Sequence, residues 1–254
     1  MNFEKQTPRA ALITGAARRI GAAIARGLSR AGYAIVLHAN HSGDEAWHLA
    51  RQIEDDGGRA TVVLGDLADT EVLDSIVAAA AAYAPLTLLV NNASLFDEDD
   101  VTSMTRAGFE RSMAVNLTAP LFLAQAFAAQ APRDARSSIV NIVDQRVLRP
   151  TPKFFSYALS KASLYAATTT LAQALAPLRV NAVAPGPTLP SPRQSGEQFA
   201  GQAALVPLGR GPSPEDIAAA VVYLAGAQSV TGVTIAVDGG QHLSWRTPDA
   251  DVTE

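Results

Sequence analysis

The chain contains no cysteine, and this absence removes several kinds of chemistry at once. Without thiols there can be no disulfide framework, no thiolate metal site and no cysteine nucleophile. His38, His41 and His48 lack a ligand spacing such as H-E-x-x-H, so the sequence predicts no metal site. A chain without cysteine also fits a reducing compartment.

Long apolar runs and a basic stripe are missing as well. The first nine residues are polar and have no signal-peptide character. No run reaches the roughly 18 apolar residues that a membrane span needs. The net charge is −4, with acidic and basic residues interspersed, which gives no sign of nucleic-acid binding. We therefore expect a cytoplasmic protein without a membrane or nucleic-acid partner.

Short apolar runs alternate with longer alanine-rich stretches along the whole chain. The 254 residues are 48% hydrophobic, which is enough for one sizeable core, and no linker or internal repeat divides them. Seven runs are continuously apolar, as is typical of strands covered on both faces. They lie at residues 11–13, 34–37, 61–64, 86–90, 138–143, 178–183 and 233–237. The sequence predicts a single-domain α/β fold with a doubly wound, seven-stranded, mostly parallel sheet.

Two features of helices and loops complete this prediction. An apolar stripe begins at Ile20 and should end before Gly32, which predicts the first helix. Residues 187–212 are rich in proline, serine, glutamine and glycine and have no strand pattern, so we interpret them as a substrate lid. Residues 1–8 and 246–254 are polar and are expected to form flexible tails.

The first predicted strand runs directly into the segment Thr14-Gly15-Ala16-Ala17-Arg18-Arg19-Ile20-Gly21. Small residues let backbone amides approach a pyrophosphate at a helix N-terminus, where the helix dipole favours anions. Arg19 stands where the related T-G-x-x-x-G-x-G pattern has its middle glycine. Two arginines at the positive end of a helix are electrostatically unfavourable unless an anion is bound, so they indicate an anion-binding site. We predict that Gly15, Arg18, Arg19, Ile20 and Gly21 bind a cofactor pyrophosphate; the alternative is a plain turn with solvated arginines.

The end of the second predicted strand bears on the choice of cofactor. It lacks the carboxylate that binds the ribose hydroxyls in NAD sites. Arg18, His41 and Ser42 could instead bind a 2′-phosphate, so the sequence favours NADP(H). His38 is included in this site, although His38 and His41 could equally be residues that only end the strand.

Asp66 and Leu67 follow the third predicted strand and are expected beside the adenine ring. The carboxylate of Asp66 could accept a hydrogen bond from the adenine amino group. It could equally cap the helix that begins near Thr70. Both interpretations stay open.

Tyr157 and Lys161 are four residues apart, so on a helix they share a face. An ammonium beside a phenol favours the phenolate, which would lower the tyrosine pKa and create a tunable general acid. With five tyrosines and three lysines, this spacing would arise by chance about 0.06 times. The pair is therefore suggestive, and other residues must support it.

The segment Asn91 to Phe96 follows the fourth predicted strand. Ligands of doubly wound sheets bind at the carboxyl ends of strands. Asn92 and Ala93 are therefore expected to line the cofactor, and Ser94 and Phe96 to face whatever stacks on the nicotinamide. Core packing is the alternative role for Phe96.

Asn116 lies within an apolar helical run, four residues before Pro120. Because proline has no N–H, the carbonyl of Asn116 loses its helical donor. Our hypothesis is that this carbonyl holds a water that Lys161 also contacts, which would give protons a route to Tyr157. The alternative is a kinked packing helix with a buried amide.

Six ordered motifs resemble the short-chain dehydrogenase/reductase family, and the match covers about residues 9–243. They are residues 14–21, Asn91-Asn92-Ala93, Asn116, Tyr157 with Lys161, Pro185-Gly186 and Asp238-Gly239-Gly240. The resemblance implies a Rossmann-type fold, a homotetramer and hydride transfer from a nicotinamide. It also implies that Asn116, Tyr157 and Lys161 act as relay, acid and pKa-lowering partner. Pro185 and Gly186 would border the nicotinamide.

Asp144 departs from the family pattern, which usually has serine at this position. A carboxylate would repel a polarised carbonyl oxygen, but it suits N–H donors or a ring nitrogen that must be protonated. The pteridine reductase subgroup, with the similar dihydromonapterin reductases, has this aspartate and resembles the chain at Arg19, Ser94 and Phe96. In the subgroup, phenylalanine and nicotinamide sandwich a pterin, and the arginine and serine contact the pterin or the cofactor phosphate. In the segment that binds NADP in this subgroup, His41 of this chain replaces the usual arginine.

The sequence therefore predicts NADPH-dependent reduction of a C=N bond in a pterin or dihydropterin. The expected substrate-binding residues are Arg19, Ser94, Phe96, Asp144 and Tyr157. One alternative is an NADP-dependent carbonyl or alcohol oxidoreductase, in which Asp144 makes only structural hydrogen bonds. A second is a non-catalytic NADPH-binding sensor, against which the intact Asn116, Tyr157 and Lys161 argue.

Overall fold

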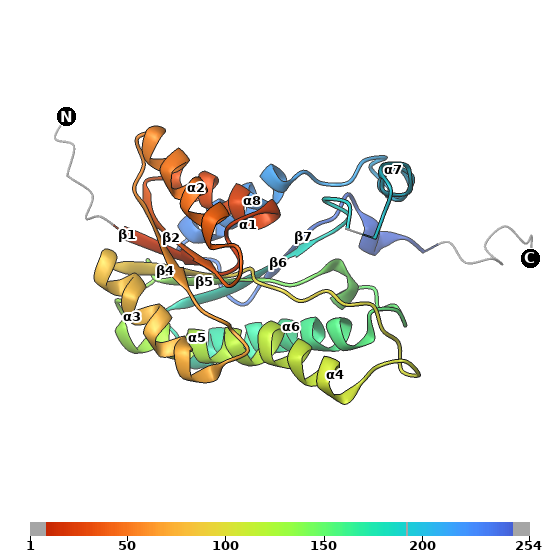
Figure 1. Ribbon diagram of the computed structural model, residues 1–254, viewed down its shortest axis with the longest axis horizontal. Helices are drawn as coiled ribbons and strands as arrows, with labels where there is room; N and C mark the ends of the chain where they lie inside the picture. The colour runs from red at the N-terminus through yellow and green to blue at the C-terminus, as the bar shows by residue number, and fades with distance from the viewer. Residues whose placement is uncertain (1–8, 192, 246–254) are drawn as a thin grey trace, which may run out of the picture.

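The computed structural model describes residues 9–191 and 193–245. Both predicted tails, residues 1–8 and 246–254, lie outside the described residues. Figure 1 shows one central sheet with a layer of helices on each side. This arrangement confirms the predicted single-domain, Rossmann-type fold.

All seven predicted strands are present, and every neighbouring pair is parallel. The strands are β1 (Arg9–Ile13), β2 (Tyr33–Ala39), β3 (Ala60–Leu64), β4 (Leu86–Asn91), β5 (Ser138–Ile142), β6 (Arg179–Pro185) and β7 (Thr234–Val237). Their order in the sheet is β3-β2-β1-β4-β5-β6-β7. The chain reverses its direction of winding between β1 and β4, and this switch point is where ligands of such sheets bind.

The helices divide between the two faces of the sheet (Figure 1). One face carries α1 (Arg19–Arg30), α2 (Gly43–Asp55) and α8 (Pro214–Gly226), and the other carries α3 (Leu73–Tyr83), α4 (Arg106–Met113), α5 (Ala119–Gln130) and α6 (Phe155–Ala174). Successive residues of β1 enter opposite cores: Ala11 and Ile13 pack on the first face, and Ala10 and Leu12 on the second. Burial on both faces explains why the strands read as continuous apolar runs.

Short elements connect these layers. They are the 3₁₀ turns η1 (Thr70–Val72), η3 (Gln145–Val147) and η4 (Gln241–Leu243), and the π-turn η2 (Ala114–Thr118). The first helix ends as predicted, because Gly32 adopts φ +85° just after its last turn. Within the predicted lid, however, residues 196–204 form a helix, α7 (Gly196–Ala204). Ser195 and Gln198 cap its first turn reciprocally, and this S-x-x-Q signature was available in the sequence.

The segment Arg106–Gln130 is continuously helical and, by length and composition alone, long and apolar enough to cross a membrane. Core helices meet the same criteria. Leu123 and Phe127 of this segment have no exposed surface and pack against α3 and the sheet. The segment therefore behaves as a core helix in this fold.

Truncating Phe127 to alanine should lower the free energy of unfolding by about 3–5 kcal/mol, because its buried ring would leave a cavity. Phe122→Ala on the same helix is the matched control, since that ring is 47% exposed, and should cost clearly less. Chemical denaturation of both variants tests this expectation. Equal losses would contradict the packing described for α5.

Candidate active site

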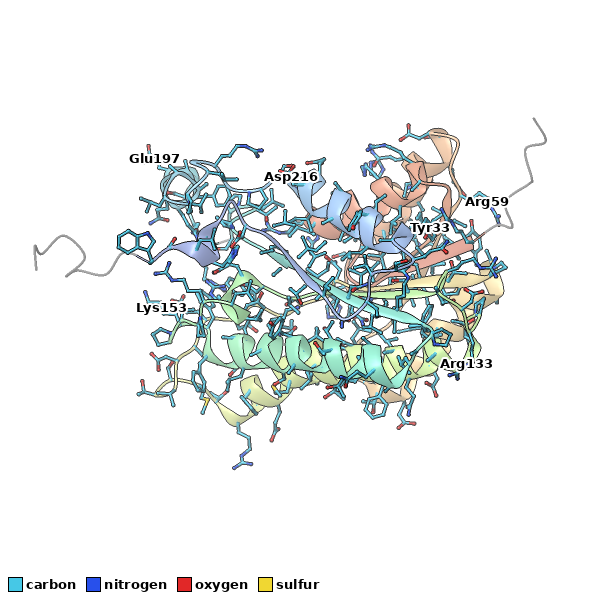
Figure 2. All side chains as sticks on the ribbon, turned by 180° about the vertical axis from the view of Figure 1, so that it is seen from behind. Tyr33, Arg59, Arg133, Lys153, Glu197 and Asp216 are labelled. Carbon is cyan, nitrogen blue, oxygen red and sulfur yellow. The ribbon has the colours of Figure 1, made fainter. Side chains whose placement is uncertain are left out.

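A cleft of about 1040 Å³ opens at the carboxyl ends of the strands. Residues at or just after the ends of five strands line the cleft: Gly15, His38, Asn92, Asp144 and Gly186. Figure 2 shows Lys153 and Glu197 at this end of the molecule, with Arg59 and Arg133 at the opposite end. The volume is at the upper end of the range for ligand sites, as a dinucleotide with a second small molecule requires.

The loop after β1 is locked against the loop after β4. The side-chain amide of Asn92 donates to the carbonyls of Thr14 at 2.8 Å and Gly15 at 3.0 Å. Gly15 has φ +61°, and a Cβ on Gly21 would lie 2.3 Å from the Gly15 oxygen. Ala93 closes the contact by donating its N–H to the Thr14 hydroxyl at 3.0 Å. Glycine is therefore required at both positions, which keeps the loop compact enough for a pyrophosphate.

Arg19 adopts φ +55°, the left-handed conformation that glycine favours. This explains why the related pattern has glycine at the position. The Arg19 guanidinium donates to the carbonyls of Pro190 at 3.0 Å and Leu189 at 3.4 Å, so it reaches the lid. Arg18 precedes α1 without a side-chain cap, and the first turn, which includes Ile20, holds no acidic residue. The N–H groups of this helix start suit an anion.

His38 connects the phosphate loop to the next loop. The Gly15 N–H donates to its Nδ1 at 3.3 Å, and its Nε2 lies 3.1 Å from the Gly65 carbonyl. Only the neutral tautomer with the proton on Nε2 satisfies both contacts. Burial lowers the pKa of His38 to about 4. His38 thus lines the cleft as a neutral side chain that connects two loops, and it does not offer a positive charge to a phosphate.

The expected 2′-phosphate residues Arg18, His41 and Ser42 lie together at one end of the cleft. The Arg18 guanidinium is 3.6 Å from Glu45, and both side chains are well exposed. Ser42 stands at the start of α2 with its hydroxyl not used as a cap. This end can therefore offer a guanidinium and a hydroxyl to an anion, while the first turn of α2 carries the acidic residues Asp44 and Glu45.

Asp66 and Leu67 also line the cleft, and their contact with an adenine ring stays a prediction. The Asp66 carboxylate accepts the Ala68 N–H at 3.0 Å and lies 3.5 Å from Arg111. The cap of η1 is Asp69, so the alternative role of Asp66 as a helix cap is wrong. The reason is local geometry, because Asp69 directly precedes the turn.

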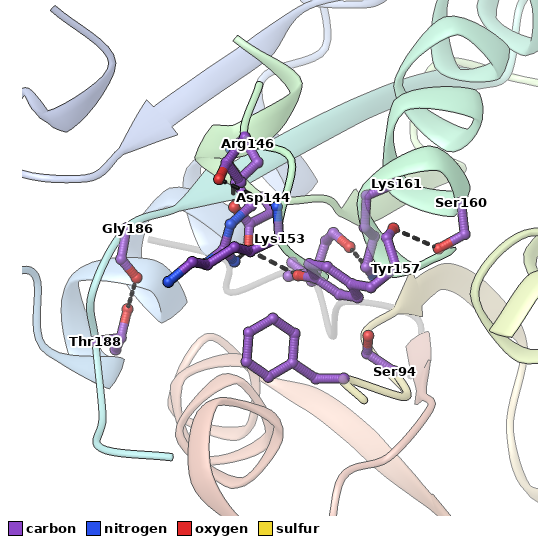
Figure 3. Close-up of polar contacts among 12 residues, drawn as sticks. Ser94, Asp144, Arg146, Lys153, Tyr157, Ser160, Lys161, Gly186 and Thr188 are labelled. Atoms are coloured by element: carbon purple, nitrogen blue, oxygen red, sulfur yellow. Dashed lines mark hydrogen bonds and ion pairs between the residues drawn. The ribbon is translucent and has the colours of Figure 1, made fainter. Parts of the chain in front are cut away.

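The phenol of Tyr157 donates a hydrogen bond to Oδ2 of Asp144 at 2.7 Å (Figure 3). The other carboxylate oxygen accepts the Arg146 N–H at 2.8 Å, which caps η3. The Arg146 guanidinium lies 3.5 Å from Oδ2. Asp144 therefore makes the structural hydrogen bond that was its alternative role, and it also faces the predicted acid.

The predicted effect of Lys161 on Tyr157 is wrong for this arrangement. The Lys161 ammonium donates to the Ile142 carbonyl at 2.7 Å and lies 5.9 Å from the centre of the phenol ring. Burial raises the pKa of Tyr157 well above its ordinary value, Asp144 raises it further, and only Arg146 lowers it. A carboxylate in hydrogen-bond contact outweighs a more distant ammonium, so the phenol stays protonated.

Lys161 is itself perturbed by its surroundings. Burial lowers its pKa to about 8, and the negative charge of Asp144 offsets part of this effect. The side chain is 2% exposed. A lysine in this state changes its charge close to neutral pH, as a proton donor in a relay must.

Asn116 lies in the π-turn η2 and has no exposed surface. Its amide oxygen accepts the Leu95 N–H at 2.8 Å, and its amide nitrogen donates to the Leu95 carbonyl at 2.9 Å and the Ser160 hydroxyl at 3.0 Å. The side chain thus joins the loop after β4 to α6, one residue before Lys161. A water relay through the Asn116 carbonyl stays a prediction.

Phe96 lies in the cleft beside the Tyr157–Asp144 pair. Its ring is stacked on Phe154, with centroids 4.2 Å apart and planes 8° apart, and meets Tyr157 edge-on at 4.7 Å. One face of Phe96 is therefore covered, so a substrate ring would use the other face or displace Phe154. Ser94 also lines the cleft, and its hydroxyl lies 3.4 Å from the Leu95 carbonyl.

The end of β6 forms another part of the cleft. Pro185 and Gly186 line it, and their contact with a nicotinamide stays a prediction. A Cβ on Gly186 would lie 2.6 Å from the Cα of Asp238, so only glycine fits. Thr188 donates to the Gly186 carbonyl at 3.0 Å and holds the start of the lid (Figure 3).

The sequence analysis did not identify five residues that line the cleft. They are Gln145, Arg146, Lys153, Phe154 and Arg193. The first two directly follow Asp144, and Phe154 is three residues before Tyr157, so proximity to predicted catalytic residues was an available signal. Nothing in the sequence indicates Arg193, because the lid brings it over the cleft only in the folded chain.

Comparison with known proteins gives four informative similarities. A family model described as enoyl-(acyl carrier protein) reductase matches residues 15–242. The structure of FolM alternative dihydrofolate reductase 1 from Brucella suis in complex with NADP is 48% identical, with a TM-score of 0.91 over 96% of this chain and 98% of that chain. 3β-hydroxysteroid dehydrogenase 1 from Eggerthella lenta is 35% identical over 91% of this chain and 93% of the relative. Galactitol 2-dehydrogenase from Agrobacterium fabrum is 32% identical over 93% and 98%.

His38 makes stability depend on pH. Its pKa is about 4 in the folded chain and 6.5 when unfolded, so the unfolded state binds the proton more readily. The stabilisation is complete above pH 6.5 and is lost as the pH falls toward 4, by about 2–4 kcal/mol. Denaturant titrations at pH 7 and pH 4.5 should show this loss, and His38→Gln should reduce it. His48→Gln, on an exposed helix face, is the control, and an equal reduction there would refute the assignment.

Proposed function

The chain belongs to the short-chain dehydrogenase/reductase family of oxidoreductases, and we propose that it catalyses the NADPH-dependent reduction of a C=N bond in a pterin or dihydropterin. Support comes from the similar structure of FolM alternative dihydrofolate reductase 1 in complex with NADP. The chemistry of the chain's own residues supports the same conclusion. By family likeness we further propose a homotetramer, and we propose a cytoplasmic location, which fits a chain without cysteine.

The residues at the switch point fit a dinucleotide. The glycines at positions 15 and 21 leave no room for a Cβ, and the start of α1 has neither a side-chain cap nor an acidic first turn. Asn92 and Gly186, from the ends of β4 and β6, also line the cleft. These residues would hold NADPH, which supplies the hydride when it is bound. Arg18 and Ser42 would meet the 2′-phosphate.

The hydrogen bond from Tyr157 to Asp144 is the observation that carries the pterin proposal. A carboxylate at this position repels a carbonyl oxygen that gains negative charge. It attracts the N–H and amino groups at the edge of a pterin ring, which are donors. The serine that is usual in the family at this position is uncharged, and its hydroxyl can form a hydrogen bond with either kind of group.

The proton required by the reduction is held at the same place. The Tyr157 phenol is protonated because burial and Asp144 raise its pKa, so it can donate to a ring nitrogen at this edge. The neighbouring Asp144 carboxylate would stabilise the cationic ring that protonation creates. Lys161, with a pKa of about 8 and its ammonium 5.9 Å from the centre of the phenol ring, would return that proton through a water.

A carbonyl or alcohol oxidoreductase is the second candidate, favoured by a specific observation. Both relatives named above are dehydrogenases, one of a steroid alcohol and one of a sugar alcohol. In that case Asp144 would serve only to cap η3 through the Arg146 N–H. A panel of ketones, alcohols and dihydropterins with NADP(H) separates the two candidates.

Replacing Asp144 should change turnover in a substrate-dependent way. Asp144→Asn keeps the size of the side chain but removes the charge, so kcat/KM for a dihydropterin should fall about 10²–10⁴-fold. Asp144→Ser should lose pterin reduction similarly while ketone reduction rises. The measurement is NADPH oxidation with both substrates. Near-normal dihydropterin reduction by the asparagine variant would overturn the pterin assignment.

The charge of Lys161 should appear in the pH dependence of kcat. Since its pKa is about 8, the ammonium is lost as the pH rises through this value, and kcat should fall on the alkaline side. Lys161→Arg stays charged over the whole range and should remove this limb, whatever its absolute rate. An unchanged alkaline limb in the arginine variant would assign the ionisation to another group.

A further inference from the structure

The Arg18 side chain lies between the cofactor end of the cleft and a carboxylate of the next helix. Arg18 lines the cleft together with His41 and Ser42. It also lines a neighbouring hollow between α1 and α2, and Glu45 lines the same hollow (Figure 1). The Arg18 guanidinium is 3.6 Å from the Glu45 carboxylate, and the two side chains are 65% and 49% exposed. An exposed ion pair of this kind is weak, so a ligand can replace one partner at little cost.

Glu45 depends on Arg18 for the neutralisation of its charge. Among the residues that the structure describes, no other cation lies within 4.0 Å of the Glu45 carboxylate. The second arginine of the hollow, Arg26, donates instead to the side-chain oxygen of Gln52 at 2.6 Å. Asp44 adds another negative charge to the same first turn of α2. Arg18 is therefore the cation that balances this acidic turn in the free protein.

The two nicotinamide cofactors would affect this ion pair differently. NADP(H) carries a 2′-phosphate with about two negative charges and three acceptor oxygens, whereas NAD(H) has an uncharged hydroxyl at that position. A guanidinium binds phosphate oxygens through two parallel hydrogen bonds, so the phosphate would displace the carboxylate from Arg18. Glu45 would then be unpaired and close to a second anion, which opposes binding. NAD(H) leaves the ion pair intact and meets no such cost.

From this arrangement we infer that Glu45 determines cofactor specificity: it weakens the preference for NADP(H) over NAD(H) because it competes with the 2′-phosphate for Arg18. The competition rests on the proposed contact between Arg18 and that phosphate, and it is independent of the substrate. Removing the charge of Glu45 should therefore strengthen the binding of NADP(H) and leave that of NAD(H) unchanged. Misfolding cannot produce a gain in affinity, so the sign of the effect is diagnostic.

The test measures the dissociation constants of NADP⁺ and NAD⁺ by isothermal titration calorimetry, with no substrate present. The quantity compared is the ratio of Kd for NAD⁺ to Kd for NADP⁺, in which general damage to the site cancels. Glu45→Gln should raise this ratio about 2- to 5-fold, which is the effect of an exposed ion pair. Glu45→Lys replaces the negative charge by a positive one and should raise the ratio further. Both gains should shrink as salt is added.

Two further variants make the test specific. Arg18→Gln should lower the ratio about 10-fold or more, because the phosphate loses a charged hydrogen-bond donor. In the Arg18→Gln background, Glu45→Gln should lose most of its effect, since the two residues act as a pair. Glu54→Gln is the matched control: it removes the same charge from an exposed position of α2, about 14 Å farther along the helix. It should leave the ratio as it is in the wild type.

The outcomes separate this inference from the proposed function. If Glu45→Gln lowers the ratio, leaves it unchanged or raises it no more than Glu54→Gln does, the competition is refuted while the contact of Arg18 with the phosphate stands. A full gain from Glu45→Gln in the Arg18→Gln background also refutes it, because the effect then does not pass through Arg18. If Arg18→Gln leaves the ratio unchanged, the proposed place of the 2′-phosphate fails and the inference fails with it.

Discussion

The hydrogen bond between the Tyr157 phenol and the Asp144 carboxylate is the contact on which the chemistry of this protein depends. It joins the first turn of α6 to the end of β5, so it requires the sheet and the helix layer to be in place. It also decides protonation, because a buried phenol beside a carboxylate keeps its proton. The cation that opposes this effect is Arg146, and the Lys161 ammonium is bound instead to a backbone carbonyl of β5.

A second set of contacts gives the cofactor end its shape. The loop after β1 is held by Asn92 from the loop after β4 and by the neutral His38 from β2. Residues from three neighbouring strands thus hold Gly15 in place. The start of α1 has no side-chain cap, so its N–H groups can bind an anion. Two features of Arg19 connect this end to the substrate end: its left-handed backbone and its reach to the lid carbonyls.

The prediction from sequence was most successful where a residue type has one physical use. Continuous apolar runs predicted all seven strands, because burial on both faces leaves no polar positions. Gly15 was identified because a tight turn needs glycine, and Asp144 because a carboxylate stands where the resembled family usually has serine. The prediction failed where the outcome depends on the distance between charged groups in the folded chain. The spacing of Tyr157 and Lys161 on one helix face suggested direct contact, yet the group in hydrogen-bond contact with the phenol is Asp144, which lies after β5, 13 residues earlier in the chain.

By itself, then, the sequence determined the sheet, the glycine loop and the identity of the groups at the reacting edge, since each follows from local pattern or from the chemistry of one side chain. Only the tertiary structure decided which charges meet. It placed Arg146 rather than Lys161 as the cation that lowers the phenol pKa, covered one face of Phe96 with Phe154, and brought Arg193 over the cleft from a segment 97 residues away. Electrostatic effects fall steeply with distance and depend on burial, and neither quantity exists until the chain is folded.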